Sequence, residues 1–179
     1  DLATGVVDRF RSMPMSRLAV LAGRTLADLA RNTFVVALMT VIGILVGFHP
    51  QGGVTGFLLG GCLVLLTAFA FSWVFALVGL KAASAEAAQA VAFPLIFPLT
   101  FASSAFVPVQ TMPGWLQAFA KYQPITVIVD ATRGLMAGPD EAAKLLQAGL
   151  LTRPTSTSVV HALAWIALIL AVAAPLAVT

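Results

Sequence analysis

The chain has 179 residues, of which 60% are hydrophobic and 9% are charged, and its mean hydropathy is +0.99. A soluble domain has about 25% charged residues and disorder requires low hydrophobicity, so the composition excludes both classes and predicts an all-α integral membrane protein. One cysteine excludes an internal disulfide framework, and the net charge of +3 comes from bases scattered between apolar stretches, a pattern of membrane topology and not of nucleic-acid binding.

The first sixteen residues, 1–16, are predicted to form an amphipathic helix. Val6, Phe10 and Met13 recur at spacings of three and four residues, which places them on one helical face. Pro14 ends this helix, because the residue before a proline avoids the helical region. Ser16 is then placed to cap the next helix.

Four apolar stretches are predicted to cross a membrane: 17–48, 54–80, 90–107 and 159–178. The third stretch contains Pro94 and Pro98, so we expect a kinked helix inside a polytopic bundle.

Two Gly-x-x-x-Gly patterns fall in these stretches, Gly43 with Gly47 and Gly56 with Gly60. They indicate close helix packing, within the chain or between chains, or simply the high glycine content of apolar sequence. We expect Cys62 to be a small buried side chain.

Residues 108–158 have no apolar run of spanning length. Two short helices are expected there, at Trp115–Ala120 and Pro124–Met136, in a re-entrant or interfacial position. A surface helix at Asp140–Gln147 is expected to stop at Gly149.

Two interactions are predicted in the same region. Asp130 and Arg133 stand at i and i+3, so we expect them to pair. Trp115 and Tyr122 are typical of a membrane interface.

The distribution of bases predicts the orientation. Six Lys or Arg residues belong to the first segment and the connection near Lys81, and four belong to residues 108–158. The positive-inside rule therefore places the start of the chain in the cytoplasm.

No motif of an energy-converting or hydrolytic site is present. The sequence lacks Gly-Lys-Ser/Thr, Gly-x-Ser-x-Gly, His-Glu-x-x-His and Cys-x-x-Cys. The apolar run Thr33–Phe48 of the first stretch and the centres of the other three carry no Asp, Glu, Lys or Arg. We therefore expect the chain not to be an enzyme by itself. Either a partner protein supplies the energy for transport, or the chain does not move any substrate against its gradient.

An aromatic stripe marks the third stretch. Phe93, Phe97 and Phe101 stand at i, i+4 and i+8, beside Thr100 and Ser104. The stripe indicates either a pathway for a hydrophobic or amphipathic substrate or aromatic residues that face lipid or pack.

Several segments together resemble the type-2 ABC exporter permeases: Glu86–Gln89, Phe97–Pro108, Met112–Ala120, Gln123–Thr126 and Asp130–Arg133. The opening segment Thr4–Arg17 resembles the coupling segment of their daunorubicin-resistance branch. Gln123 stands where many relatives have Asn before the proline.

The resemblance implies a six-span permease that forms a homo- or heterodimer and binds ABC ATPase subunits, which hold ATP and Mg while this chain holds no cofactor or metal. The four stretches would be the third to sixth spans, with the first two before Asp1. Residues 1–16 would be the coupling helix and 108–158 an external loop with re-entrant helices. The implied coupling residues are Asp8, Arg9, Phe10, Arg11, Met13 and Pro14. The implied loop residues are Pro113, Trp115, Pro124, Asp130 and Arg133.

The implied function is ATP-driven export of an amphipathic drug or lipid across the bacterial inner membrane by a multi-pass permease subunit, with a role in drug efflux and antibiotic resistance. Export of a glycan and a non-transport membrane scaffold remain alternatives. Co-purification with an ATPase would separate a transporter from a scaffold.

Overall fold

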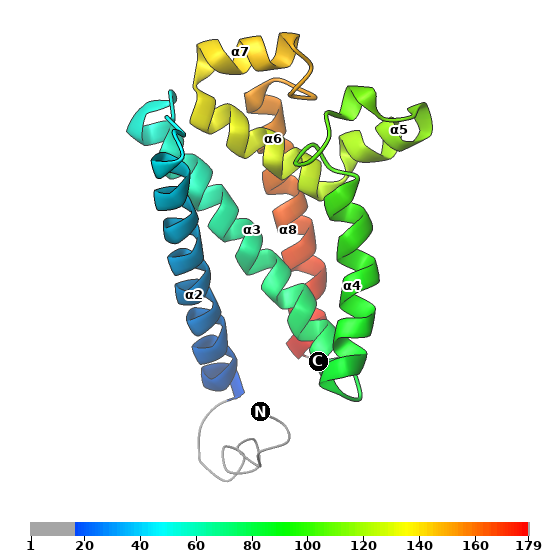
Figure 1. Cartoon of the computed structure of the whole chain (residues 1–179). Coiled ribbons are helices and arrows are strands. Elements are labelled where there is room, and N and C mark those ends of the chain that lie inside the picture. Colours follow the sequence, from blue (N-terminus) through cyan, green and yellow to red (C-terminus); the bar gives the residue numbers. More distant parts are fainter. Residues whose placement is uncertain (1–16, 179) are drawn as a thin grey trace.

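The computed structural model describes residues 17–178, all of whose regular elements are helices (Figure 1). In chain order these are α2 (Arg17–Leu45), α3 (Gly53–Lys81), α4 (Ala85–Phe101), the 3₁₀ turn η2 (Val109–Thr111), α5 (Gly114–Tyr122), α6 (Pro124–Ala137), α7 (Pro139–Gln147) and α8 (Thr155–Val178). The predicted coupling helix at 1–16, with Asp8, Arg9, Phe10, Arg11, Met13, Pro14 and the Ser16 cap, lies outside the described residues.

Four of these helices coincide with the four apolar stretches. The segments Leu26–Leu45, Gly53–Lys81 and Thr155–Leu176 are each long and apolar enough to cross a membrane. The helix α4 has 17 residues and ends at Phe101, six residues before the expected end. Beyond that end, both the amide and the hydroxyl of Ser103 donate to the Thr100 carbonyl oxygen, as the chain turns.

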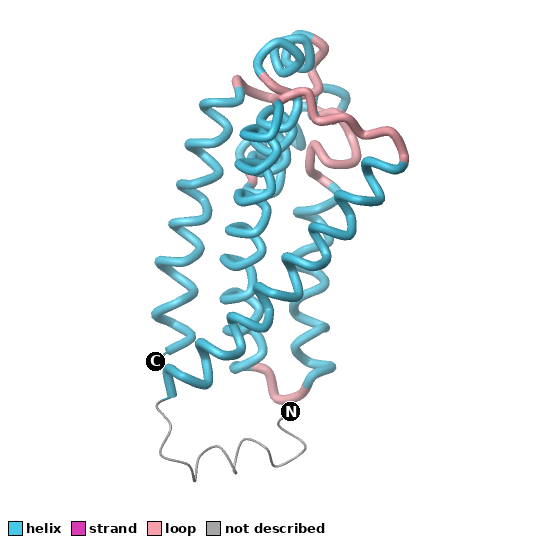
Figure 2. Tube along the Cα trace, turned by 90° about the vertical axis from the view of Figure 1, so that its left-hand side faces the viewer, coloured by secondary structure: helices cyan, strands magenta, loops and turns pink. Residues whose placement is uncertain are grey.

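The long helices run side by side, and the short helices gather at one end (Figures 1 and 2). The start of α2, the α3–α4 connection near Lys81 and the end of α8 lie at the other end. Lys81 thus shares an end with the start of the described chain, as the base distribution predicts.

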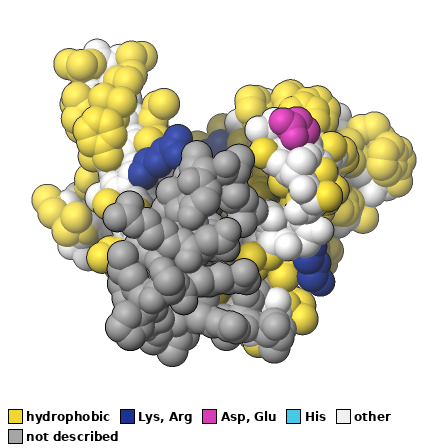
Figure 3. All heavy atoms as spheres, turned by 90° about the horizontal axis from the view of Figure 1, so that it is seen from below, with side chains coloured by type: hydrophobic (Ala, Val, Ile, Leu, Met, Phe, Trp, Pro, Cys, Tyr) yellow, Lys and Arg dark blue, Asp and Glu magenta, His cyan; other side chains and the backbone are white. Residues whose placement is uncertain are grey.

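The core lies where α3, α6 and α8 meet, and its buried side chains are Leu63, Ala70, Val127, Ile128, Ala131, Ala162 and Ile166. By contrast, no side chain in the apolar segment of α2 is buried. Seen from the end where α2 begins and α8 ends, the described atoms in view are mostly hydrophobic side chains, with Lys, Arg, Asp and Glu side chains in isolated spots (Figure 3). Cys62 is exposed, so the prediction that it is buried is wrong; its side chain lies outside the α3–α6–α8 core.

Glycines bring α3 against α6. A Cβ atom added at Gly52 or Gly56 would collide with the Leu135 carbonyl oxygen, and one at Gly60 would lie 3.0 Å from the Met136 side chain. The Gly52 amide donates to the Met136 carbonyl oxygen at 2.8 Å. The Gly56–Gly60 pattern is therefore a packing motif within the chain.

The Gly43–Gly47 pattern has a different role. A Cβ atom at Gly43 would contact only the nearby Phe48, and Gly47 has a φ of +104° just after the end of α2. Gly47 therefore serves the turn that follows the helix.

Candidate functional site

The helix α6 carries most of the predicted loop residues, and Gln123 positions its start. The Gln123 side-chain oxygen accepts from the Ile125 amide at 3.1 Å, and its nitrogen donates to the Leu99 carbonyl at 3.0 Å and to the Thr126 hydroxyl at 2.9 Å. Gln123 thus joins the start of α6 to the end of α4. Sequence reasoning missed this role, although a polar side chain directly before Pro124 is a helix-start signal.

Asp130 on α6 is fully buried and is held by three hydrogen bonds. One carboxyl oxygen accepts from the Ser104 hydroxyl at 2.7 Å. The other accepts from the Thr152 amide at 2.8 Å and from the Thr152 hydroxyl at 2.6 Å. One side chain therefore ties α6 to the segment after α4 and to the segment before α8. Thr152 was not identified from the sequence.

The predicted pair of Asp130 and Arg133 does not form. Arg133 donates to the Leu150 carbonyl oxygen at 3.0 Å and to the Ser104 carbonyl oxygen at 3.3 Å. Spacing alone favoured the pair, but the groups of Ser104 and Thr152 satisfy Asp130, and main-chain oxygens satisfy Arg133. Both side chains therefore contact Ser104 and not each other.

Of the residues predicted to line a substrate pathway in the third apolar stretch, Ser104 does not lie with the exposed aromatic rings. Its exposed fraction is 5%, whereas the three rings of α4 are exposed. Phe93 and Phe97 are 5.4 Å apart between ring centroids, and Phe97 and Phe101 are 4.3 Å apart. Thr100 is half-buried. The rings form one exposed stripe, and Ser104 belongs to the polar cluster around Asp130.

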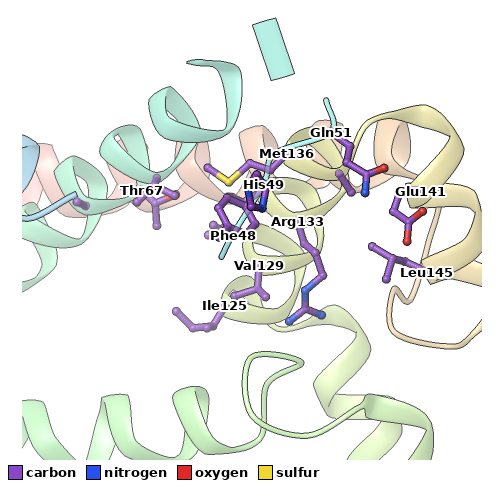
Figure 4. A pocket seen from close by; sticks show the side chains of 15 residues that line it. Phe48, His49, Gln51, Thr67, Ile125, Val129, Arg133, Met136, Glu141 and Leu145 are labelled. Carbon is purple, nitrogen blue, oxygen red and sulfur yellow. The ribbon is translucent and has the colours of Figure 1, made fainter. Parts of the chain in front are cut away.

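An open cavity of about 740 Å³ lies between α3, α6, α7 and the α2–α3 turn (Figure 4). Its walls are largely apolar and include Val64, Ala68, Ile128, Val129 and Met136. The glycine contact holds α3 and α6 together beside this cavity, and α7 closes one side of it. A volume of this size is typical of a small-molecule pocket, for which roughly 300–1,000 Å³ is usual.

A few polar groups also line this cavity. The Thr132 hydroxyl is buried and has no hydrogen-bond partner. Arg133, His49 and Glu141 lie among the lining residues that Figure 4 labels. Glu141 pairs with Lys144 at 3.0 Å. Apolar walls with few polar groups suit an amphipathic ligand.

The remaining predicted loop residues lie around α5 and α6. Pro113 precedes the first residue of α5, and Pro124 is the first residue of α6. Trp115 is 77% exposed on α5. Within residues 17–178, no group of three or more His, Cys, Asp or Glu side chains is arranged to hold a metal ion.

Comparison with known proteins shows one family. The family model described as ABC-2 type transporter matches residues 1–137. The daunorubicin resistance ABC transporter permease protein DrrB1 of Streptomyces coeruleorubidus is 39% identical over 139 residues, which cover 77% of this chain and 49% of that relative. The probable doxorubicin resistance ABC transporter permease protein DrrC of Mycobacterium tuberculosis is 27% identical over 136 residues, covering 75% and 49%.

The chain therefore spans about half the length of the curated relatives that it matches. No solved structure matches it significantly. The match to permeases and the apolar helices together indicate a multi-pass membrane protein.

Proposed function

This chain belongs to the ABC-2 type transporter family, and on that premise we propose that it is part of the transmembrane subunit of an ATP-driven exporter. The proposed cargo is an amphipathic drug or lipid that leaves the bacterial cell across the inner membrane. The names of two relatives, which refer to resistance to daunorubicin and doxorubicin, support a drug of this kind.

The cavity between α3, α6, α7 and the α2–α3 turn is the observation that carries this proposal. It offers about 740 Å³ between apolar walls, with the unpartnered Thr132 hydroxyl among its lining atoms. An amphipathic molecule would place its apolar body between α3 and α6 and a polar group near Thr132 or Arg133.

The energy for export would come from a partner. The sequence has no nucleotide-binding motif of the Gly-Lys-Ser/Thr type, so an ABC ATPase subunit would bind ATP and Mg. Residues 1–16 would form the contact, with Arg9 and Arg11 supplying charge and Phe10 filling a groove. A second permease subunit would complete the assembly.

Filling the cavity tests the function. In the full-length protein expressed with its ATPase, Ala68→Trp is expected to lower daunorubicin export by about tenfold or more, because the indole occupies the cavity. Ala76→Trp is the matched control, since Ala76 is exposed on the same helix and does not line the cavity. Equal export by the two variants would exclude the cavity as the binding site of the exported substrate. Absence of ATP-dependent export of both daunorubicin and a labelled phospholipid by the unaltered complex would exclude the function.

A further inference from the structure

We propose that the cavity between α3, α6, α7 and the α2–α3 turn prefers an anionic amphiphile, whose oxyanion, a phosphate or a carboxylate, is held by the Arg133 guanidinium while its apolar body lies against α3. The inference rests on the proposed function and deepens it, because it ranks the possible cargoes by the charge of their head group.

Arg133 is a charged lining residue whose charge is not balanced by a carboxylate. The ionisable side chains that line the cavity are Arg133, Glu141 and His49. The Glu141 carboxylate pairs with the Lys144 amine at 3.0 Å, so its charge is already compensated. Among the described side chains, no carboxylate lies within ion-pair distance of the Arg133 guanidinium. The lining is therefore positively charged at Arg133.

Two main-chain oxygens hold the Arg133 guanidinium in place without neutralising it. One terminal nitrogen donates to the Leu150 carbonyl oxygen at 3.0 Å, and the other donates to the Ser104 carbonyl oxygen at 3.3 Å. A guanidinium has five N–H donors in one plane, so these two bonds leave donors for a ligand. Figure 4 shows the side chain extending away from the α6 ribbon. A fixed guanidinium of this kind suits a phosphate or a carboxylate, which accepts two parallel N–H···O bonds.

The cavity also continues along a spanning helix, which gives room for an apolar body. Its lining runs from Gln51, just before α3, to Ala68. Ala68 stands 15 residues after Gly53, the first residue of α3, which is about 22 Å along the helix axis. Thr67 lines this part, but its hydroxyl donates to the Leu63 carbonyl oxygen of the same helix at 2.8 Å. The α3 wall therefore offers apolar contact to a chain or a ring system.

The α6 wall offers a second donor beside Arg133. The Thr132 hydroxyl is buried, has no hydrogen-bond partner and belongs to the lining. A buried polar group without a partner is costly, so an oxygen of the ligand that accepts from Thr132 would stabilise the complex. Donors on α6 and an apolar wall on α3 together match a molecule with an oxygen-rich head and an apolar body.

The same charges disfavour a cationic head. An amine would meet the uncompensated charge of Arg133, and the lining carboxylate, Glu141, already pairs with Lys144. Like charges placed close together reduce affinity, which is a common way to reject a wrong ligand. An amine should therefore bind more weakly than a carboxylate that carries the same apolar body.

Three fluorescent probes with one apolar body test this inference: a dansyl-labelled undecanoate, its uncharged amide and the matching primary amine. Full-length protein purified with its ATPase, without nucleotide, is titrated with each probe. Dansyl emission is excited through the protein tryptophans, so that probe in detergent micelles does not contribute. We expect the carboxylate to bind about tenfold or more tightly than the amide, and the amine to bind most weakly.

Variants assign the preference to Arg133. Arg133→Gln should bind the carboxylate no better than the amide, and Arg133→Lys should keep part of the preference. Arg153→Gln is the matched control and should keep all of it, because Arg153 is also half-buried but lies over the Tyr122 ring and does not line the cavity. Glu141→Gln should raise the affinity for the carboxylate by about twofold or more, since it removes a negative charge from the lining.

Several outcomes would overturn the inference. Equal affinities for carboxylate and amide, or tightest binding of the amine, would exclude an anionic head. An unchanged preference in Arg133→Gln would exclude Arg133 as its holder. Displacement of the carboxylate probe by an equal concentration of inorganic phosphate would show a site for a free oxyanion that needs no apolar body.

The design separates this inference from loss of structure and from the proposed function. Unchanged binding of the amide by Arg133→Gln shows that the cavity is intact, and a gain of affinity in Glu141→Gln cannot result from unfolding. Binding is measured without nucleotide or export. Charge-selective binding without export would exclude only the transport function, and export without charge-selective binding would exclude only this inference.

Discussion

Asp130 is a fully buried carboxyl group, and its position explains how the short helices keep their place. A buried polar side chain is costly unless it is hydrogen-bonded. Asp130 accepts from Ser104 and twice from Thr152, which lie 26 and 22 residues away in the sequence. The carboxyl group therefore connects three segments that the chain order separates.

We expect Asp130→Leu to lower the free energy of unfolding by about 1–3 kcal/mol or more, because it leaves the Thr152 amide and two hydroxyls without an acceptor. Asp130→Asn keeps one acceptor oxygen and should cost less. Thermal unfolding of the full-length protein in detergent measures both changes, and hydrogen exchange of the Thr152 amide should be faster in Asp130→Leu.

The control for this prediction is Asp140→Asn, a change at an exposed residue in the first turn of α7. It should alter the unfolding free energy by about 0.5 kcal/mol at most. Equal unfolding temperatures for all three variants would mean that the polar cluster contributes no stability.

At the scale of whole helices, glycines set the distance between α3 and α6. A side chain at Gly56 would meet the backbone oxygen of Leu135, which cannot rotate away as a side chain can. Helices in membranes depend on such close approach, because lipid gives no hydrophobic reason for them to associate. The α3–α6 contact also forms one wall of the cavity.

Gly56→Ala is therefore expected to destabilise the protein by about 1–3 kcal/mol through overpacking. Gly79→Ala is the matched change on the same helix, where an added Cβ atom would have no neighbour within 4 Å. It should be neutral or slightly stabilising, since alanine favours helix over glycine. Unfolding in detergent compares the two, and equal effects would contradict a specific role of the α3–α6 contact.

The helices were more predictable than their contacts. The long apolar run at 54–80, Pro124 and Gly149 indicate the elements now seen as α3, α6 and α7, because these signals are local. The i, i+3 spacing of Asp130 and Arg133 indicates that they are near each other. It cannot indicate that Ser104 and Thr152 donate to Asp130 instead. The roles of Gln123 and Thr152, and the cavity itself, depend on segments that only the folded chain brings together.

At the scale of the whole molecule, the structure separates two ends. The helices α5, α6 and α7 gather at one end, and the Lys81 connection lies at the other (Figures 1 and 2). Basic residues are concentrated towards the start of the chain and Lys81. Because positive residues favour the cytoplasmic side, we expect the α5–α7 end to face outward.

Cysteine labelling in intact cells measures this orientation. Since Cys62 is exposed, it is first changed to Ala. Asp140→Cys on α7 should then react with a membrane-impermeant thiol reagent from outside. Lys81→Cys and Ser12→Cys should react only after the cells are permeabilised. The pair Asp140 and Lys81 is decisive because both residues are exposed at opposite ends of the described structure, so a difference in labelling reports the side of the membrane and not burial. The reverse pattern would place α5–α7 in the cytoplasm. An ATPase could then not reach residues 1–16, and the coupling proposal would fail together with the orientation.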